Sequence, residues 1–268
     1  MKFLFFFLLI AMLMGGCGTR MKVLTLNTWQ EKGLWQERWQ LILKGLEEYD
    51  ADIVGFQEVF NMEWAEEIRR RSGYPYLAVS GQHSGLVFLS RFKPLEQECL
   101  VLKAKSPNED YQRYAFYIQV ETPKGKIALF NTHLSWKSVD DAVRMEQVKE
   151  LAAFVRQKAG NLPALIMGDF NTAPDTAPIN FLRDSSQWLD TYAEANTEWV
   201  GLTWDYRNPY AEKERDKMAE RRIDYIFVTP AQGPFAAIRS SRVVFDQPEG
   251  DVWPSDHFGV LTEFSGKR

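Results

Sequence analysis

Residues 165–171 read Leu-Ile-Met-Gly-Asp-Phe-Asn, a short apolar run that ends in polar side chains. Such a run predicts a buried strand over Leu165–Met167. Burying an unpaired carboxylate is costly, so Asp169 should lie where this strand leaves the core. Asp169 and Asn171 are two residues apart, and in extended chain their side chains would point the same way. The stretch therefore predicts a strand end that presents two polar groups to one place.

Three other apolar runs end in the same manner: Val23–Leu26, Ile53–Phe56 and Ile127–Phe130. A single polar residue at a strand end is more often a turn former or a cap than a functional group. Here all four strand ends carry side chains of ligand or acid–base type, and in layered sheets ligands bind at such a rim. One assembled site therefore accounts for them better than four independent caps: Asn27, Glu58, His133 and Asp169.

The rest of the chain alternates helical and extended patterns. Trp35, Trp39, Ile42 and Leu46 recur at helical spacing, and the charged segment 206–222 predicts a solvated loop. Taken alone, the alternation favours a parallel sheet. The further predicted elements are a helix over 62–71, a helix capped by Ser138 and Asp141 that continues up to Gly160, and strands over 77–79, 86–89, 95–102, 111–121, 223–228 and 258–261.

The composition excludes several classes of protein. The 268 residues are 45% hydrophobic and 25% charged, which argues against a disordered chain, collagen or a multispanning membrane protein. A net charge of -4 provides no global cationic field for nucleic acid. Two cysteines cannot build a disulfide framework, and three histidines leave little room for a histidine-rich metal cluster. A soluble domain that relies on its core remains.

Residues 1–20 form a separate segment. The apolar run Phe3–Met14 would extend about 18 Å as a helix, short of the roughly 30 Å hydrocarbon core, and its length is typical of a signal peptide. Leu13–Cys17 resembles a bacterial lipobox, which implies acylation of Cys17 and an exported lipoprotein of the cell envelope, held at the membrane. Two alternatives stay open: Cys17 lies near an ordinary cleavage site, or Met21 is the true start and the protein is cytoplasmic.

Six short motifs in order resemble the endonuclease/exonuclease/phosphatase superfamily, whose fold is that of pancreatic deoxyribonuclease I. The resemblance covers Val23 to Phe264 and implies one domain over residues 21–268. It implies a four-layer α/β/β/α sandwich of two mostly antiparallel sheets with outer helices, in place of the parallel sheet. The motifs are Leu24-Thr25-Leu26-Asn27, Gln57-Glu58, Asn131-Thr132-His133-Leu134, Gly168-Asp169-Phe170-Asn171, Arg222-Ile223-Asp224-Tyr225 and Ser255-Asp256-His257.

A metal site is the first implication. Hydrolysis of a phosphate ester needs charge neutralisation on the phosphoryl oxygens, and Glu58 offers the hard carboxylate oxygen that suits Mg²⁺. Asn27 is a neutral neighbour able to orient Glu58 or complete the metal shell. The resemblance implies that Asp256 supports the same metal or a second one. We therefore expect Mg²⁺ at Glu58, Asn27 and Asp256, with Mn²⁺ as a substitute.

Proton transfer is the second implication. His257 has the near-neutral pKa of a general base. By resemblance, Asp224 bonds the other nitrogen of that imidazole and fixes its tautomer. Asn171 contacts the phosphate, and Asp169 orients the attacking water or assists proton transfer. His133 resembles the histidine that binds a phosphoryl oxygen and helps to protonate the leaving group.

The predicted activity is Mg²⁺-dependent hydrolysis of a phosphodiester, with monoesters less favoured. Residues 133–224 are also similar to neutral sphingomyelinases, so the first alternative is a sphingomyelinase-like phospholipase C, followed by a nuclease or a catalytically silent binding module. Small molecules or lipid headgroups are favoured over duplex nucleic acid, and we expect a monomer. His83 could touch substrate from its loop and Arg113 could reach a phosphate, but both are interpreted as surface residues. Four tryptophans near the motifs are candidates to contact substrate: Trp29, Trp136, Trp204 and Trp253.

Overall fold

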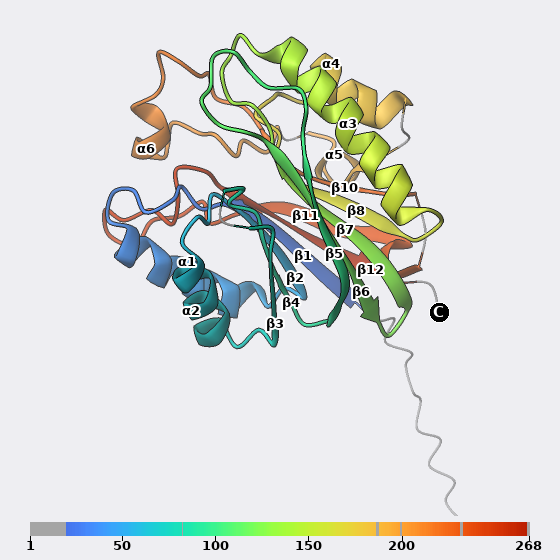
Figure 1. The fold of residues 1–268 in the computed structure, drawn as a ribbon. Coiled ribbons are helices and arrows are strands. Elements are labelled where there is room, and N and C mark those ends of the chain that lie inside the picture. The colour runs from blue at the N-terminus through green and yellow to red at the C-terminus, as the bar shows by residue number, and fades with distance from the viewer. Residues whose placement is uncertain (1–19, 82, 186–187, 199, 231–232, 267–268) are drawn as a thin grey trace, which may run out of the picture.

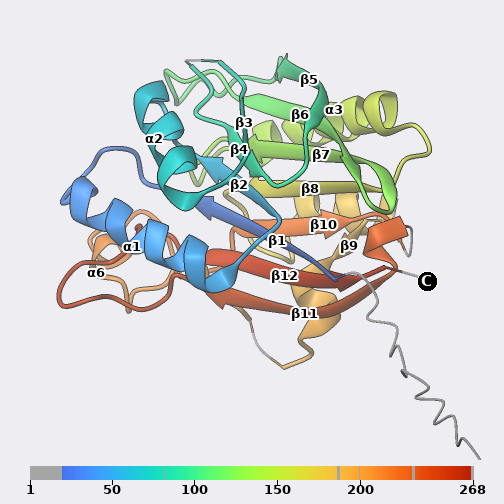
Figure 2. The ribbon, with the colours of Figure 1, turned by 90° about the horizontal axis from the view of Figure 1, so that it is seen from below.

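Two six-stranded sheets pack face to face, with helices on both outer sides (Figures 1 and 2). The computed structural model describes residues 20–81, 83–185, 188–198, 200–230 and 233–266. The first sheet has the order β11 (Ala237–Val244), β12 (Gly259–Ser265), β1 (Arg20–Asn27), β2 (Ile53–Gln57), β4 (Val87–Ser90), β3 (Tyr76–Val79). The second has the order β5 (Pro94–Val101), β6 (Tyr114–Thr122), β7 (Gly125–His133), β8 (Ala164–Asp169), β10 (Asp224–Val228), β9 (Leu189–Asp190).

Long helices cover each sheet on its outer side. Helices α1 (Trp35–Tyr49) and α2 (Met62–Ser72) lie beside the first sheet, and α3 (Asp141–Ala159) lies along the second (Figure 1). Asn61 caps α2 by accepting bonds from two backbone amides, and Gly73 ends it in a left-handed conformation. The shorter elements are α4 (Ala177–Asn180), a π-helical turn (Phe181–Ser185), α5 (Thr191–Ala195), α6 (Pro209–Glu212) and a 3-10 turn (Gly233–Phe235).

The apolar strands are buried on both faces, which explains their unbroken hydrophobic sequences. On β1, Val23 faces the core between the sheets, while its neighbour Leu24 packs with α1. On β7, Leu129 faces the inter-sheet core and Phe130 packs with α3. The predicted four-layer sandwich is confirmed.

Two pairs of strands are parallel and the other neighbours are antiparallel. β1 and β2 pair with Asn27 beside Gln57, and β7 and β8 pair with His133 beside Asp169. Each pair is joined by one helix, α1 in the first sheet and α3 in the second. Carboxyl ends of parallel strands lie at the same edge, so this topology gathers the four predicted strand ends at one end of the sandwich.

The charge of segment 206–222 predicted a solvated loop, and the structure shows that this is only partly correct. The segment contains α6, and Ala211 and Met218 pack with Trp204 and Ile223 in a small apolar cluster. Its charged residues pair with one another, as Glu214 does with Lys217. Strand β11 was not predicted, because this strand at the sheet edge is mostly polar and exposed.

The predicted export segment lies outside the described residues, apart from Arg20. Over the part of the chain that the structure describes, we find no helix with the length and apolar character needed to cross a bilayer.

Candidate active site

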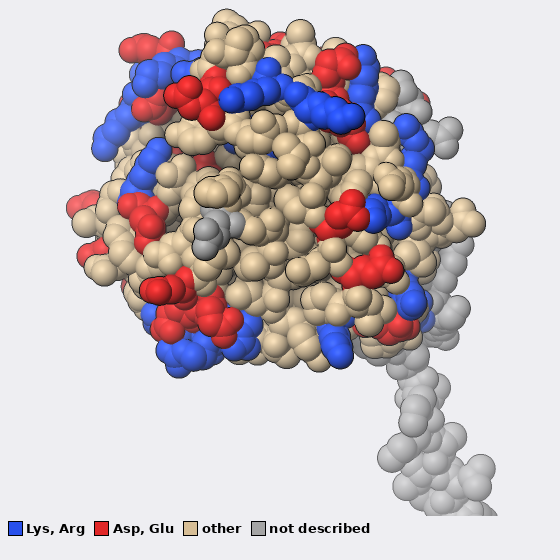
Figure 3. Space-filling model, viewed as in Figure 1, with Lys and Arg blue, Asp and Glu red and all other residues tan. Residues whose placement is uncertain are grey.

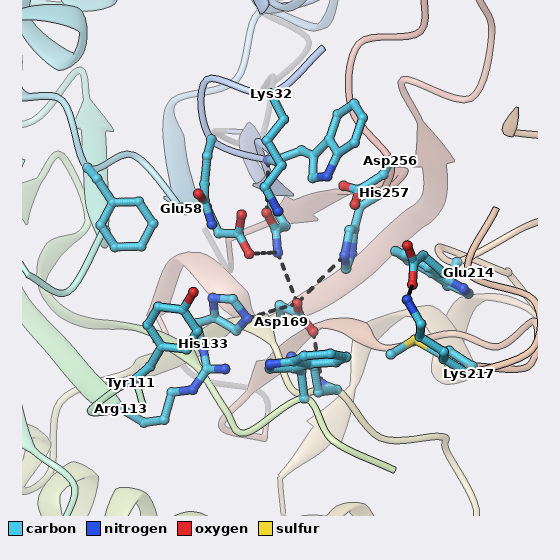
Figure 4. Close-up of a pocket in the computed structure, with 18 residues that line it drawn as sticks. Lys32, Glu58, Tyr111, Arg113, His133, Asp169, Glu214, Lys217, Asp256 and His257 are labelled. Atoms are coloured by element: carbon cyan, nitrogen blue, oxygen red, sulfur yellow. Dashed lines mark hydrogen bonds and ion pairs between the residues drawn. The ribbon is translucent and has the colours of Figure 1, made fainter. Parts of the chain in front are cut away.

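A cavity of about 320 Å³ opens at the end of the sandwich where β1, β7 and β8 terminate (Figure 4). Side chains separated by up to 230 positions in the chain meet there. Asp224 stands behind the cavity wall, bonded to His257. The predicted site residues that line the cavity are Asn27, Glu58, His133, Asp169, Asn171, Asp256 and His257.

Asp169 lies between two imidazoles. Its carboxylate accepts a hydrogen bond from Asn27 Nδ2 (3.0 Å), and Oδ2 lies 3.3 Å from His133 Nε2 and 3.8 Å from His257 Nε2. Its other oxygen accepts the backbone N–H of Asn171 (2.9 Å). Burial raises the pKa of Asp169 to about 7; the Asp224 charge adds to the rise and His257 opposes it. This carboxyl group can therefore exchange a proton near neutrality.

His257 and Asp224 form a buried pair. His257 Nδ1 lies 3.0 Å from Asp224 Oδ2, and because an ionised carboxylate only accepts, Nδ1 is the donor. The imidazole therefore directs Nε2 toward Asp169. Burial lowers the pKa of His257, but the charges of Asp224, Asp169 and Asp256 outweigh it and raise that pKa well above its ordinary value.

Glu58 supplies the carboxylate oxygen ligand that is expected at a site for a hard cation. Its Oε1 lies 3.4 Å from Asn27 Nδ2, and its buried Oε2 has no hydrogen-bond partner among the described residues. Burial raises the pKa of nearby Asp256 to about 6, with Glu58 adding to the rise and His257 opposing it. An unpaired buried carboxylate oxygen is unfavourable unless a cation binds it, so Glu58 and Asp256 fit a divalent metal. Asn27 directs Nδ2 toward Glu58 while its Oδ1 accepts the backbone N–H of Trp29 (3.0 Å), so it orients Glu58 beside that metal.

A second grouping of ligands also lies close enough to hold a cation. Oxygen and nitrogen atoms of Asp169, Asp224 and His257 all lie within 4.8 Å of one another. In that grouping, however, His257 Nδ1 already bonds Asp224, and Asp169 already accepts from Asn27. Glu58 Oε2 and Asp224 Oδ1 are both buried without a hydrogen-bond partner in the described part of the chain, but only Glu58 lines the cavity, so the Glu58 position is the better site for a cation that contacts substrate.

His133 and Asn171 form the opposite side of the cavity. Burial, together with the charges of Arg113 and His257, lowers the pKa of His133 well below its ordinary value. His133 is therefore neutral at neutral pH and can donate or accept a hydrogen bond. Asn171 Nδ2 donates to Leu134 O (3.1 Å), which fixes the amide beside the end of β7. The roles given to these side chains stay predictions.

The interpretation of Arg113 as a surface arginine is wrong. This residue is 8% exposed, lines the cavity, and donates through Nε to Glu109 (3.0 Å). The sequence carried no signal for this burial, because the partner lies in an irregular segment before β6. His83 is exposed and lines an adjoining cavity of about 240 Å³, which meets the first at Arg113 and His133.

The cavity wall also contains residues that no motif indicated. Lys32 points into it from the loop after β1, and Lys217 reaches it from the segment after α6 (Figure 4). Three of the four candidate tryptophans line it: Trp29, Trp136 and Trp204. The fourth, Trp253, stacks instead on Phe258 with ring centroids 5.7 Å apart.

The surface charge is mixed. On the face shown in Figure 3, groups of Lys and Arg lie beside groups of Asp and Glu. This distribution is in keeping with the net charge of -4. Tight binding of a duplex depends on many basic side chains that neutralise successive phosphates.

The sequence from residue 24 to residue 257 matches the model of the endonuclease/exonuclease/phosphatase family. The chain belongs to this family. The family's enzymes hydrolyse phosphate esters, and the chain is accordingly a hydrolase of phosphate ester bonds.

Relatives and solved structures are similar over most of this chain. An inositol phosphosphingolipids phospholipase C of Schizosaccharomyces pombe is 25% identical, over 92% of this chain and 69% of the relative. Nocturnin of Drosophila melanogaster is 24% identical, over 88% of this chain but only 42% of its own length. A solved mannosyl-6-phosphatase of Bacteroides thetaiotaomicron has the same fold, with a TM-score of 0.74, 20% identity and coverage of 90% of this chain and 98% of that one.

Proposed function

We propose that this protein is a Mg²⁺-dependent phosphodiesterase. The observation that carries the proposal is the unpaired, buried Oε2 of Glu58 in the same cavity as Asp169, which itself lies between His133 and His257. A cation ligand and groups able to transfer protons thus surround one space large enough for a phosphoryl group.

Glu58 and Asp256 would hold the metal, and Asn27 would orient Glu58 through Nδ2. A bound divalent cation supplies charge neutralisation on the phosphoryl oxygens and polarises the ester. Asn171 and His133 bind phosphoryl oxygens from the opposite side. In its neutral form His133 donates one hydrogen bond to the departing ester oxygen.

Proton transfer is shared by His257 and Asp169. Asp224 holds His257 so that Nε2 points into the cavity, where the imidazole removes a proton from the attacking water as predicted. The electrostatics of the metal-free site favour a related assignment, in which His257 stays protonated and Asp169, with a pKa of about 7, accepts that proton. Both assignments place the attacking water beside the same two side chains.

A diester is favoured over a monoester because the cavity continues on both sides of His133. One side holds Trp136 and Trp204, and the adjoining cavity holds His83 and Ser84. Two organic substituents on one phosphorus could therefore be accommodated. The tryptophan faces offer apolar surface for a sugar, a base or a lipid headgroup.

A sphingomyelinase-like phospholipase C is the second candidate. The similarity to the yeast phospholipase favours it, since that relative aligns over 92% of this chain. Nuclease activity ranks third because of the mixed surface charge. A catalytically silent binding module is disfavoured, because every predicted acid–base and metal position carries a competent side chain.

Hydrolysis of bis-p-nitrophenyl phosphate by the purified protein, with Mg²⁺ and then with EDTA, tests the proposal. We expect turnover that EDTA abolishes and that Glu58→Gln strongly reduces, whereas Glu63→Gln, at an exposed position of α2, leaves it unchanged. Absence of metal-dependent turnover on any phosphoester would favour the binding module. Sphingomyelin vesicles and supercoiled plasmid then distinguish phospholipase from nuclease.

We also propose that residues 1–20 direct export and that a lipid on Cys17 holds a monomeric domain at the membrane of a bacterial envelope. Mass spectrometry of the native N-terminus is the test. A diacylated Cys17 as first residue would support the proposal, and an intact Met21 start would exclude it.

A further inference from the structure

Two fully buried arginines occupy matching positions in the two halves of the sandwich. Arg38 is the fourth residue of α1 and follows Asn27, the last residue of β1, by eleven positions. Arg144 is the fourth residue of α3 and follows His133, the last residue of β7, by the same number. Their exposed fractions are 0% and 1%. Each arginine thus stands at the start of the helix that joins a pair of parallel strands.

Arg38 uses all five of its N–H donors on backbone carbonyl groups. Four of these belong to the loop between β1 and α1, and the fifth belongs to Pro254, just before the Ser255-Asp256-His257 motif. The accepting oxygens and distances are Thr28 (2.8 Å), Trp29 (3.2 Å), Gln30 (2.7 Å), Lys32 (3.1 Å) and Pro254 (3.0 Å). The guanidinium therefore ties the loop that follows Asn27 to the segment that carries Asp256.

Arg144 makes the corresponding contacts in the other half, but only within that half. Its Nη1 donates to the carbonyl groups of Ser135 (2.8 Å) and Lys137 (2.7 Å), and its Nη2 bonds Asp141. The two carbonyl groups flank Trp136, which lines the cavity. Arg144 therefore fixes the backbone on both sides of a cavity-lining side chain, and none of its hydrogen bonds in the described part of the chain goes to Asn27 or Asp256.

Burying a guanidinium costs more free energy of desolvation than filling the same space with an apolar side chain of similar size. The planar guanidinium fork of five donors binds several fixed oxygens at once, which the single ammonium of lysine cannot do. Near Arg38 the charges of Asp256 and Glu58 partly offset the cost of burial. The arrangement is therefore suited to fixing backbone segments around the cavity rather than to filling the core.

We propose that Arg38 and Arg144 are positioning residues with separate tasks. Arg38 aligns Asn27 and Asp256 for the metal, and Arg144 aligns Trp136 for the substrate. The inference rests on the proposed metal-dependent function but assigns parts of it to different helices. A merely structural role would lower stability in both variants without separating their effects on metal and substrate.

Calorimetric titration of Mn²⁺ into metal-free Arg38→Lys and Arg144→Lys, with wild type as reference, measures metal affinity apart from activity. We expect Arg38→Lys to weaken Mn²⁺ binding about 10–100-fold, the usual effect of losing a group that orients a ligand. Arg144→Lys should bind Mn²⁺ within about twofold of wild type. In hydrolysis of bis-p-nitrophenyl phosphate it should raise KM severalfold and leave kcat within about twofold.

Equal Mn²⁺ affinities in both variants, with wild type binding normally, would overturn the inference and leave the proposed function intact. A wild type that binds no Mn²⁺ would overturn both. Should Arg38→Lys not fold, Ser255→Ala replaces it, because Ser255 Oγ lies 2.7 Å from Asn27 O and 3.2 Å from Asp256 Oδ1 and so joins the same two segments. Unchanged Mn²⁺ affinity in Ser255→Ala would then contradict the assignment.

Discussion

Asp169 is the residue at which the two halves of the site meet. Its carboxylate accepts a hydrogen bond from Asn27 of the first sheet and lies beside His133 of the second. His257, in the segment before β12, lies on its other side. Three acidic groups around one histidine make a region of concentrated negative charge. That charge keeps His257 protonated without metal, and it would attract a divalent cation.

Loss of the imidazole tests its part in catalysis. We expect His257→Ala to lower kcat by about 10²–10⁴-fold, the usual contribution of a positioned acid–base group. Thermal melting should show a folded variant, because His257 lines an open cavity and its truncation leaves no enclosed void. Near wild-type turnover would contradict the assignment of His257.

The pKa directions predict how stability depends on pH in EDTA. In the folded protein the pKa of Asp169 is about 7, against an ordinary value of 3.8, so the folded state holds a proton that the unfolded chain releases. The stability that this proton contributes is lost between about pH 4 and pH 7 and changes no further above pH 7, whereas the raised pKa of His257 makes stability fall above pH 6.5, the ordinary value of that imidazole. The lowered pKa of His133 acts in the opposite direction: it makes stability rise with pH, but only up to about pH 6.5, the ordinary pKa of histidine.

We therefore expect the melting temperature of the metal-free protein to drop between about pH 6.5 and pH 8, and Mg²⁺ to restore it at pH 8. Asp169→Asn should show a smaller drop, because it removes the upper end of the Asp169 titration and one of the charges that raise the pKa of His257. A melting temperature that rises over this interval, or an unchanged slope in Asp169→Asn, would show that these carboxyl and imidazole groups do not carry the effect.

At the level of elements, the end of β8 depends on a close approach to β7. Gly168 has a φ of +142°, and a Cβ there would lie 2.0 Å from the carbonyl oxygen of Thr132. That oxygen belongs to the backbone of a central strand, so it cannot move without shifting its neighbours. Gly168 thus allows Asp169 to sit beside His133.

Gly168→Ala should destabilise the fold by about 1–3 kcal/mol and reduce activity, because Asp169 moves with the strand end. Gly125→Ala is the matched control: Gly125 has a φ of +100°, but a Cβ there would meet nothing within 4 Å. We expect the control to keep full activity in the same hydrolysis assay. Equal activity losses in both variants would mean that strain, rather than the contact with Thr132, matters.

The sequence allowed the strands that form the site to be predicted, because each joins an apolar run to a polar end. The boundaries of β1, β2, β7 and β8 differ from expectation by a few residues at most. The sequence did not indicate that Lys32 and Lys217 line the cavity, because both lie in irregular loops that have no periodic pattern. Arg113 was misjudged for a related reason: its partner Glu109 lies in a loop, where sequence spacing says nothing about burial.

At the level of the whole molecule, the sandwich brings one strand–helix–strand unit from each sheet to a common rim. The first unit carries Asn27 and Glu58, and the second carries His133 and Asp169. Strand β1 runs from Arg20 at one end of the sandwich to Asn27 at the cavity, a length of about 23 Å (Figure 2). A membrane anchor before Arg20 would therefore attach at the end opposite the site.

Anomalous diffraction from crystals of the protein soaked in Mn²⁺ tests most directly whether one metal centre forms where these units meet. A peak within about 2.5 Å of a Glu58 carboxylate oxygen, lost in Glu58→Gln, is the predicted result. Full occupancy among Asp169, Asp224 and His257 with nothing at Glu58 would contradict the account, as would the absence of any peak in the cavity.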